Sequence, residues 1–147
     1  MNNITIRRAV AEDADILTEM EQKCFTDPWD RRTFAGLLSN PTTIFTIAEI
    51  DGNPVAYGGM TVIIDECEIL NIAVSPEMRR MGIGNIMVRH MLDICRSCNV
   101  ATVFLEHRES NHAAATLYES FGFMPYAIRR KYYSSPVEDA VLRNLKL

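Results

Sequence analysis

The chain has 147 residues, of which 48% are apolar, and this length and composition suit one domain, residues 1–147, with a full hydrophobic core. Its formal net charge of −4 argues against a general nucleic-acid-binding protein, which needs a basic surface. The apolar runs are far shorter than a membrane span, and the N-terminal residues lack a signal-peptide core. We therefore expect a cytoplasmic protein with neither a nucleic-acid nor a membrane partner.

The first half of the chain predicts two helices and a group of antiparallel strands. Residues 4–7 alternate as a strand does, and residues 11–23 place apolar side chains on one helical face. Asp30 is expected to cap a second helix over residues 31–39. Strands are predicted over residues 43–50, 55–64 and 67–74, with a hairpin turn at residues 51–53. Gly58-Gly59 predicts a bulge or a close backbone approach inside the second of these strands.

The second half predicts a parallel crossover followed by two closing strands. Residues 83–98 carry apolar side chains at helical spacing, and residues 100–106 are nearly all apolar at their centre. A strand, a helix and a strand of this length form a right-handed crossover, so the strands over residues 67–74 and 100–106 should be parallel. A further helix is predicted over residues 111–120, with Gly122 as its C-cap. Residues 123–128 and 140–147 predict the closing strands, and residues 129–133 a basic, aromatic loop between them. The expected fold is α+β with three layers: a mixed, mostly antiparallel sheet of about seven strands between helices.

The stretch ILNIAVSPEMRRMGIG, residues 69–84, joins a predicted buried strand to a helix through a turn with two arginines and two glycines. The start of a helix offers free N–H groups and the positive end of the helix dipole, which favour a phosphate-bearing ligand. A P-loop is excluded because no Gly-Lys-Ser/Thr follows. A dinucleotide fingerprint is excluded because Met87 stands where the third glycine is required. The two glycines alone leave open whether the turn is a ligand cradle or an ordinary turn beneath a helix.

Two separated motifs then point to a family. RxxGxG at residues 79–84, after the strand and Ser75-Pro76, resembles the acetyl-CoA motif of the GNAT (Gcn5-related) N-acetyltransferases. NxxAxxLYxxxGF at residues 111–123 is similar to the other signature of that family, and the predicted order of elements is that of the GNAT fold. Residues 71–74, 104–111 and 128–133, with FxxPW at residues 25–29, resemble the RimI subfamily. That subfamily acetylates the N-terminal alanine of a small-subunit ribosomal protein.

The resemblance implies acetyl-CoA as cosubstrate, no metal, and the N-terminus of a ribosomal protein or similar peptide as acceptor. It assigns the general base to Glu106 and the general acid to Tyr118. The chemistry needs both roles, because an α-ammonium with a pKa of about 7.7–8.0 must lose a proton before it attacks a thioester, and the departing thiolate needs one. The residues alone leave open a solvated glutamate at a strand end and a tyrosine of the core.

The same resemblance implies which residues hold each substrate. Backbone groups of residues 72–74 would hold the pantetheine arm, where the family's two parallel strands splay apart. The expected cofactor-binding residues are Ile72, Ala73, Val74, Arg79, Arg80, Met81, Gly82, Ile83, Gly84, Asn85 and Asn111. Asn111 would equally serve as a helix N-cap. Candidates for the acceptor side are Trp29, Arg130, Tyr132, Tyr133 and Asp139, although each alone also suits a surface loop with packing aromatics.

The remaining polar residues are less informative. Cys95-x-x-Cys98 lacks the four ligands of a structural zinc site, so we expect packing, and the three histidines show no metal spacing. His107 follows Glu106 where the subfamily pattern tends to be apolar. Two other functions stay open on the sequence: a GNAT enzyme acting on lysine, a polyamine or a small amine, and an acyl-CoA-binding module without catalysis.

Overall fold

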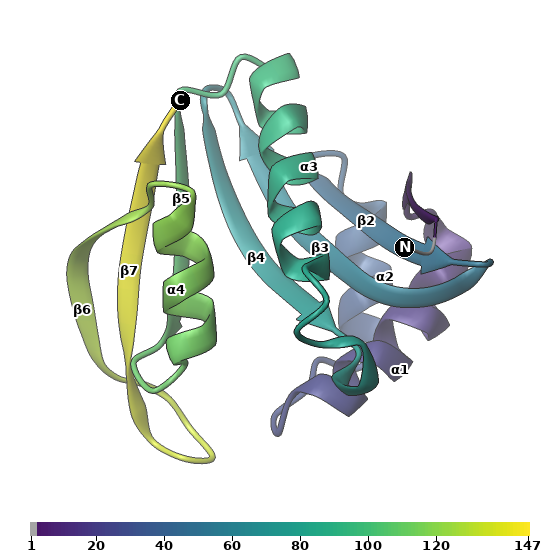
Figure 1. The fold of residues 1–147 in the computed structure, drawn as a ribbon, viewed down its shortest axis with the longest axis horizontal. Helices are drawn as coiled ribbons and strands as arrows, with labels where there is room; N and C mark the ends of the chain where they lie inside the picture. Colours follow the sequence, from purple (N-terminus) through teal and green to yellow (C-terminus); the bar gives the residue numbers. More distant parts are fainter. Residues whose placement is uncertain (1–2) are drawn as a thin grey trace.

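In a computed structural model that describes residues 3–147, the chain forms a seven-stranded mixed sheet with helices on both faces (Figure 1). The strand order is β1-β2-β3-β4-β5-β7-β6, and β4 with β5 is the parallel pair. The predicted fold class and the parallel crossover are therefore confirmed. The strands are β1 (Ile4–Arg8), β2 (Thr43–Ile50), β3 (Asn53–Ile63), β4 (Glu66–Val74), β5 (Thr102–Arg108), β6 (Met124–Tyr133) and β7 (Glu138–Lys146).

The four predicted helices are present, with small shifts at their ends. They are α1 (Ala14–Cys24), α2 (Arg31–Ser39), α3 (Ile83–Ser97) and α4 (His112–Ser120). The first begins later than predicted, because the turn Ala11–Asp13 is a 3₁₀ helix, η1. Asp30 caps α2 as expected, since its carboxylate accepts a hydrogen bond from the Thr33 N–H at 2.9 Å. A second 3₁₀ turn, η2 (Pro76–Met78), lies between β4 and α3. None of the helices within residues 3–147 is long and apolar enough to span a membrane.

Two layers of helices cover the sheet unequally. α3 and α4 pack on one face, where Val88, Met91 and Tyr118 meet Cys67 and other apolar residues of the strands. α1 and α2 pack on the other face, over β2, β3 and the end of β4, and their core includes the ring contacts of Phe34 with Phe45 and Tyr57. In Figure 1, α1 and α2 lie behind β3 and β4 and do not extend behind β5, β7 and β6. One face of these last three strands is therefore open.

The glycine pair in β3 has both predicted features, a bulge and a close approach of neighbouring groups. The pairing of β3 with β4 shifts between Gly59 and Met60, which is a bulge. Both glycines also lie against large side chains: a Cβ on Gly58 would come within 2.6 Å of the Met91 sulfur, and one on Gly59 would overlap the ring of Phe45. Met91 of α3 and the Phe45 ring of β2 therefore approach this strand more closely than a side chain at these two positions would allow.

One predicted element is wrong. Residues 129–133 were expected to form a loop, but they are the second half of β6. The strand is at the edge of the sheet and exposed on both faces, so it lacks the alternation that marks a half-buried strand. Its pairing with β7 is interrupted between Arg129 and Tyr133, where Lys131 has a φ of 52°. The Lys131 N–H donates instead to the Asp139 carboxylate at 2.8 Å.

Candidate active site

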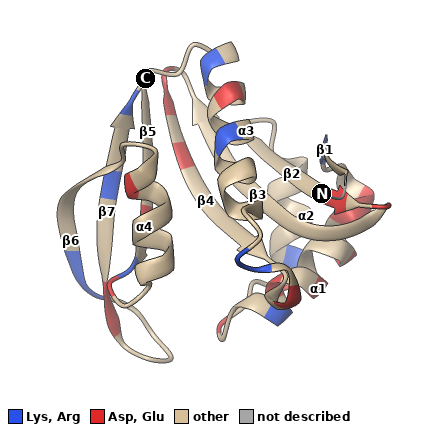
Figure 2. Cartoon of the chain, viewed as in Figure 1, with Lys and Arg blue, Asp and Glu red and all other residues tan. Residues whose placement is uncertain are grey.

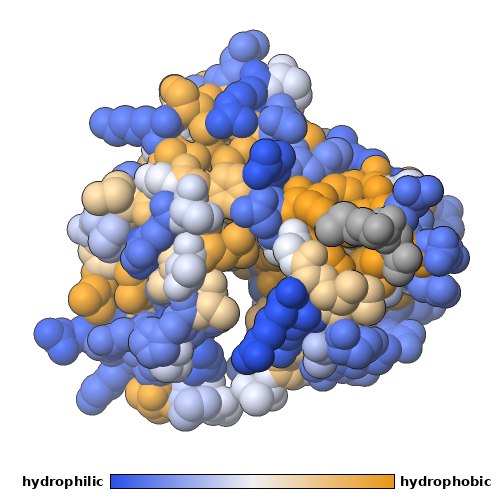
Figure 3. All heavy atoms as spheres, viewed as in Figure 1, coloured by the Kyte–Doolittle hydropathy of each residue, from blue (hydrophilic) through white to orange (hydrophobic). Residues whose placement is uncertain are grey.

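The two parallel strands separate after a short paired stretch. β4 and β5 pair only where Glu66–Glu68 lies beside Thr102–Phe104, and both strands then continue, to Val74 and Arg108 respectively (Figure 1). The separated part of β4 holds Ile72, Ala73 and Val74, the segment predicted to hold the thioester. On its β5 side this backbone faces no strand, so its N–H groups there have no strand partner and could bind a ligand. In the space-filling view an opening lies in the lower part of the molecule, between the side of β4 and the side of β5 (Figure 3).

The turn before α3 has the geometry of an anion-binding cradle. Arg80 and Gly82 have φ values of 64° and 79°, and Gly82 is the N-cap of α3 without a side-chain cap. Left-handed residues in such a turn aim successive N–H groups into one concavity, and the helix dipole adds positive charge. The arginines of this turn lie between the end of β4 and the start of α3 (Figure 2). The residues present thus suit a pyrophosphate.

Neighbouring residues shape this cradle. The Arg79 Nε donates to the Val74 carbonyl at 3.2 Å, which ties the turn to the end of β4. At Gly84, a Cβ would meet Leu117 of α4 at 3.3 Å, so glycine lets α3 and α4 approach closely. Asn111 caps α4 by accepting from the Ala114 N–H at 3.1 Å, so its capping role is confirmed. Met81 is exposed at the mouth of the turn and Ile83 is buried beneath it.

Glu106 and Tyr118 lie on different sides of β5. Alternation along β5 places Val103, Leu105 and His107 in the core against α4, and Glu106 on the opposite, open face. Tyr118 comes from α4 and packs on His107, with 6.1 Å between ring centroids. Burial raises the pKa of Tyr118 to about 12, so its hydroxyl keeps its proton well above neutral pH. Glu106 thus lies on the open face of β5, whereas Tyr118 lies on the face that α4 covers.

Glu106 has two polar neighbours on β6. Arg129 approaches its carboxylate at 3.7 Å, and the carboxylate accepts a hydrogen bond that raises the pKa of the Tyr132 hydroxyl. The Arg129 guanidinium also lies over the Tyr132 ring, 5.4 Å from its centroid. The sequence singled out Arg130 here, whereas the structure brings its neighbour Arg129 to the carboxylate. Had residues 129–133 been predicted as a strand, Arg129 would have been expected near Glu106, because alternate residues of a strand share one face of the sheet.

A groove of about 510 Å³ extends from Glu106 over the open face. Its floor and walls come from the paired ends of β4 and β5, from β6 and from the tip of the β3–β4 hairpin. Negative charge predominates among its lining groups, and aromatic side chains border it. The lining includes Ile64, Glu66, Glu68, Phe104, Tyr126 and Arg129.

His107 belongs to a buried polar network on the α4 side. Arg143 is 5% exposed, and its Nε donates to the His107 Nε2 at 2.9 Å, while another of its nitrogens pairs with Glu119 at 3.0 Å. Because Nε2 accepts, the ring proton is on Nδ1, which donates to the Arg108 carbonyl at 2.8 Å. His107 is thus a neutral core residue that fixes the surroundings of Tyr118. Its contacts do not reach the open face.

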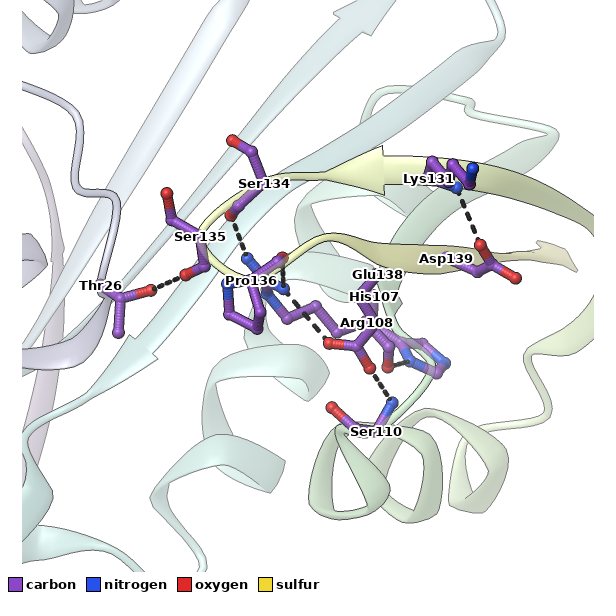
Figure 4. A network of polar contacts seen from close by, with 10 residues as sticks. All are labelled: Thr26, His107, Arg108, Ser110, Lys131, Ser134, Ser135, Pro136, Glu138 and Asp139. Carbon is purple, nitrogen blue, oxygen red and sulfur yellow. Dashed lines mark hydrogen bonds and ion pairs between the residues drawn. The ribbon is translucent and has the colours of Figure 1, made fainter.

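The β6–β7 hairpin is anchored next to the gap, as Figure 4 shows. Arg108 donates to the carbonyls of Ser134 and Pro136 at 3.0 and 2.9 Å, pairs with Glu138 at 3.2 Å, and covers the Tyr133 ring at 4.6 Å. The hairpin also reaches the segment between α1 and α2, because the Thr26 hydroxyl donates to the Ser135 carbonyl at 3.1 Å. The two halves of the sheet are therefore joined at both ends of the gap.

Trp29 lies on that same α1–α2 segment. It is half-buried, and its ring packs edge-on against Phe34, with 5.6 Å between centroids. The backbone N–H of Trp29 donates to the Glu21 carboxylate on α1, a contact that nothing in the sequence indicates. Cys95 is buried in the core and Cys98 is exposed, both as free thiols. Within residues 3–147 no three metal-ligating side chains come together.

Comparison with known proteins agrees with these features. Residues 14–123 match the model of the acetyltransferase (GNAT) family. The [ribosomal protein bS18]-alanine N-acetyltransferase of Escherichia coli K12 is 35% identical over 145 residues, covering 97% of each chain. The N-alpha-acetyltransferase RimI of Mycobacterium tuberculosis is 34% identical, covering 93% of this chain and 89% of that protein. The crystal structure of the E. coli ribosomal-protein-S18-alanine N-acetyltransferase superposes with a TM-score of 0.93 at 34% identity, over 98% of this chain and 94% of that one. The chain therefore belongs to the acetyltransferase (GNAT) family.

Proposed function

We propose that this chain transfers the acetyl group of acetyl-CoA to the N-terminal α-amine of a protein, with the N-terminal alanine of a ribosomal protein as its acceptor. The observation that carries the proposal is the position of Glu106 on the open face of β5, where β5 has separated from β4, with Tyr118 on the other side of the strand. Relatives named for the same reaction on ribosomal protein bS18 match nearly the whole chain, which supports the choice of acceptor. Such an acceptor also fits a reaction in the cytoplasm.

Acetyl-CoA binds from the side of α3 in this proposal. The pyrophosphate is held by N–H groups of residues 80–85 and by the guanidinium of Arg80, and Asn111 contacts the coenzyme from the start of α4. The pantetheine arm lies along the unpaired edge of residues 72–74. An N–H of this edge donates to the thioester carbonyl and stabilises the negative charge that develops there.

The acceptor binds on the open face, next to Glu106. Glu106 accepts a proton from the α-ammonium, and the neutral nitrogen attacks the thioester carbon, which forms a C–N bond. The C–S bond then breaks as the tetrahedral intermediate collapses, and Tyr118 donates its proton to the departing sulfur. The second proton that the nitrogen must lose to become an amide is released at this step and restores the Tyr118 hydroxyl through solvent. Base and acid act on different atoms, so their separation by β5 suits the reaction.

The surroundings of Glu106 favour a chain end as acceptor. The α1–α2 segment and the β6–β7 hairpin meet through Thr26 and Ser135, so a continuous chain would have to displace this contact to lie across this side of the gap, whereas a chain end would not. Trp29, Tyr132 and Tyr133 border the position of its first residues. Carboxylates of the groove attract a positively charged N-terminus.

Mass spectrometry of peptides incubated with acetyl-CoA tests the proposal. The mixture holds peptides that differ only in their first residue, and matched peptides with a blocked N-terminus and a free lysine. We expect acetylation at free N-termini, with alanine among the best. Acetylation of the blocked peptides at a comparable rate would refute the proposal in favour of a lysine acetyltransferase. Absence of any transfer, with acetyl-CoA still bound, would favour a non-catalytic module.

A further inference from the structure

Glu21 is a buried carboxylate for which the acyl-transfer chemistry has no use. It lies on α1, is 2% exposed, and accepts hydrogen bonds from three separate segments. Oε1 accepts from the Tyr57 hydroxyl of β3 and from the Asn71 side-chain amide of β4 at 2.8 Å. Oε2 accepts from the backbone N–H of Trp29, on the α1–α2 segment, at 3.0 Å. All three donors are uncharged.

This arrangement is costly to keep. Burial raises the pKa of Glu21, which means that the fold disfavours its charged form. A glutamine would fill the same volume without the charge, but it offers one acceptor oxygen and would turn its NH₂ group toward a donor. Only a carboxylate accepts from all three donors at once.

Two of the three partners of Glu21 lie next to the segments proposed to bind the two substrates. Asn71 immediately precedes residues 72–74, in the part of β4 that has separated from β5. Trp29 borders the acceptor, and its ring is held by Phe34 of α2. A second contact ties α1 to the other end of the same strand segment, because the Cys24 thiol donates to the Val74 carbonyl at 3.4 Å. One helix thus spans the strand that holds the thioester and the loop that borders the amine.

We propose that Glu21 is a positioning residue that fixes the acceptor loop at Trp29 relative to the thioester strand at Asn71. The inference rests on the proposed function, since it assigns these two segments to the two substrates. Reacting atoms must lie within a few tenths of an ångström of their productive separation, and a displacement of about 1 Å can lower the rate about a hundredfold. A rigid three-way hydrogen bond inside the core limits such displacements.

The Glu21→Gln variant tests this role, with Asp13→Asn as its matched control. Asp13 is also a buried carboxylate, 5% exposed and paired with Arg7 at 2.8 Å, but it lies in η1, away from the gap. Both variants should lower Tm. Glu21→Gln should also lower kcat with the peptide by about tenfold to a hundredfold. Asp13→Asn should leave kcat unchanged, and both should bind CoA as the wild type does, because α3 forms the cradle.

Trp29 supplies a readout that does not depend on activity. It is the one tryptophan of the chain, so its fluorescence reports the acceptor loop. Acrylamide should quench Trp29 more strongly in Glu21→Gln than in Asp13→Asn or the wild type. Should Glu21→Gln fail to fold, Asn71→Ala replaces it, and we expect its kcat to fall at least fivefold while CoA binding is retained.

Two outcomes overturn the inference. One is a folded Glu21→Gln protein with wild-type kcat and wild-type quenching, and the other is an Asp13→Asn protein that loses as much kcat as Glu21→Gln. A wild-type protein that acetylates no peptide would refute the proposed function instead. The quenching comparison would then still decide whether Glu21 holds the loop.

Discussion

The strands on either side of the gap are covered differently. β2, β3 and the end of β4 lie between α3 on one face and α1 with α2 on the other, and most side chains of β2 and β3 are buried on both faces. β5 and β7 have α4 on one face and no helix on the other, and β6 is exposed on both faces along nearly its whole length. The heavily packed half fixes the backbone proposed to hold acetyl-CoA. The lightly covered half leaves room for a second substrate beside Glu106.

The Glu106→Gln variant changes the residue of the open half that we propose as the general base. The change keeps the shape of the side chain and removes the base, so kcat near neutral pH should fall by about 10²–10⁴-fold. CoA binding should persist, because the cradle belongs to the other half. Steady-state kinetics with a peptide acceptor, together with calorimetric titration of CoA, measures both. Undiminished turnover would remove Glu106 from the mechanism.

A pair of truncations compares the packing of the two halves directly. Phe34 of the packed half is 0% exposed and contacts three other rings, so Phe34→Ala should lower the free energy of unfolding by about 3–5 kcal/mol. Ile128 of β6 is 59% exposed, and Ile128→Ala should change that free energy by less than about 0.5 kcal/mol. Urea denaturation followed by circular dichroism gives both values. Equal losses would show that β6 is covered in solution.

Tyr118→Phe should have a smaller effect than the loss of the base. A thiolate is already a fair leaving group, so we expect kcat to fall by about tenfold. The pKa of about 12 also predicts a pH dependence. Because the folded-state pKa lies above the ordinary value, the hydroxyl stays protonated from pH 7 to 10, and wild-type kcat should show no alkaline decline due to Tyr118 in that range. A decline centred near pH 9 that disappears in Tyr118→Phe would contradict the burial of this hydroxyl.

Most of the packed half could be predicted from the sequence, because its signals are local. The helical spacing of residues 83–98 and the glycines before it predict both α3 and the cradle. The end of β6 could not be predicted, since an edge strand exposed on both faces has no alternation to detect. The contacts of Glu21 could not be predicted either, because they join residues 36 and 50 positions apart in the chain. His107 looked like a departure near the base, but strand alternation turns it toward α4.

In the proposed reaction, one gap receives acetyl-CoA from the packed half and a peptide N-terminus from the open half. Calorimetry with two conjugates of CoA tests it, each joining the CoA sulfur to a peptide amine through an acetyl bridge. The conjugate to an N-terminal alanine should bind at least about a hundredfold more tightly than CoA, because it occupies both sides at once. The conjugate to the lysine of a blocked peptide should bind no more tightly than CoA. Equal affinity of the two conjugates, or no gain for either, would contradict the account.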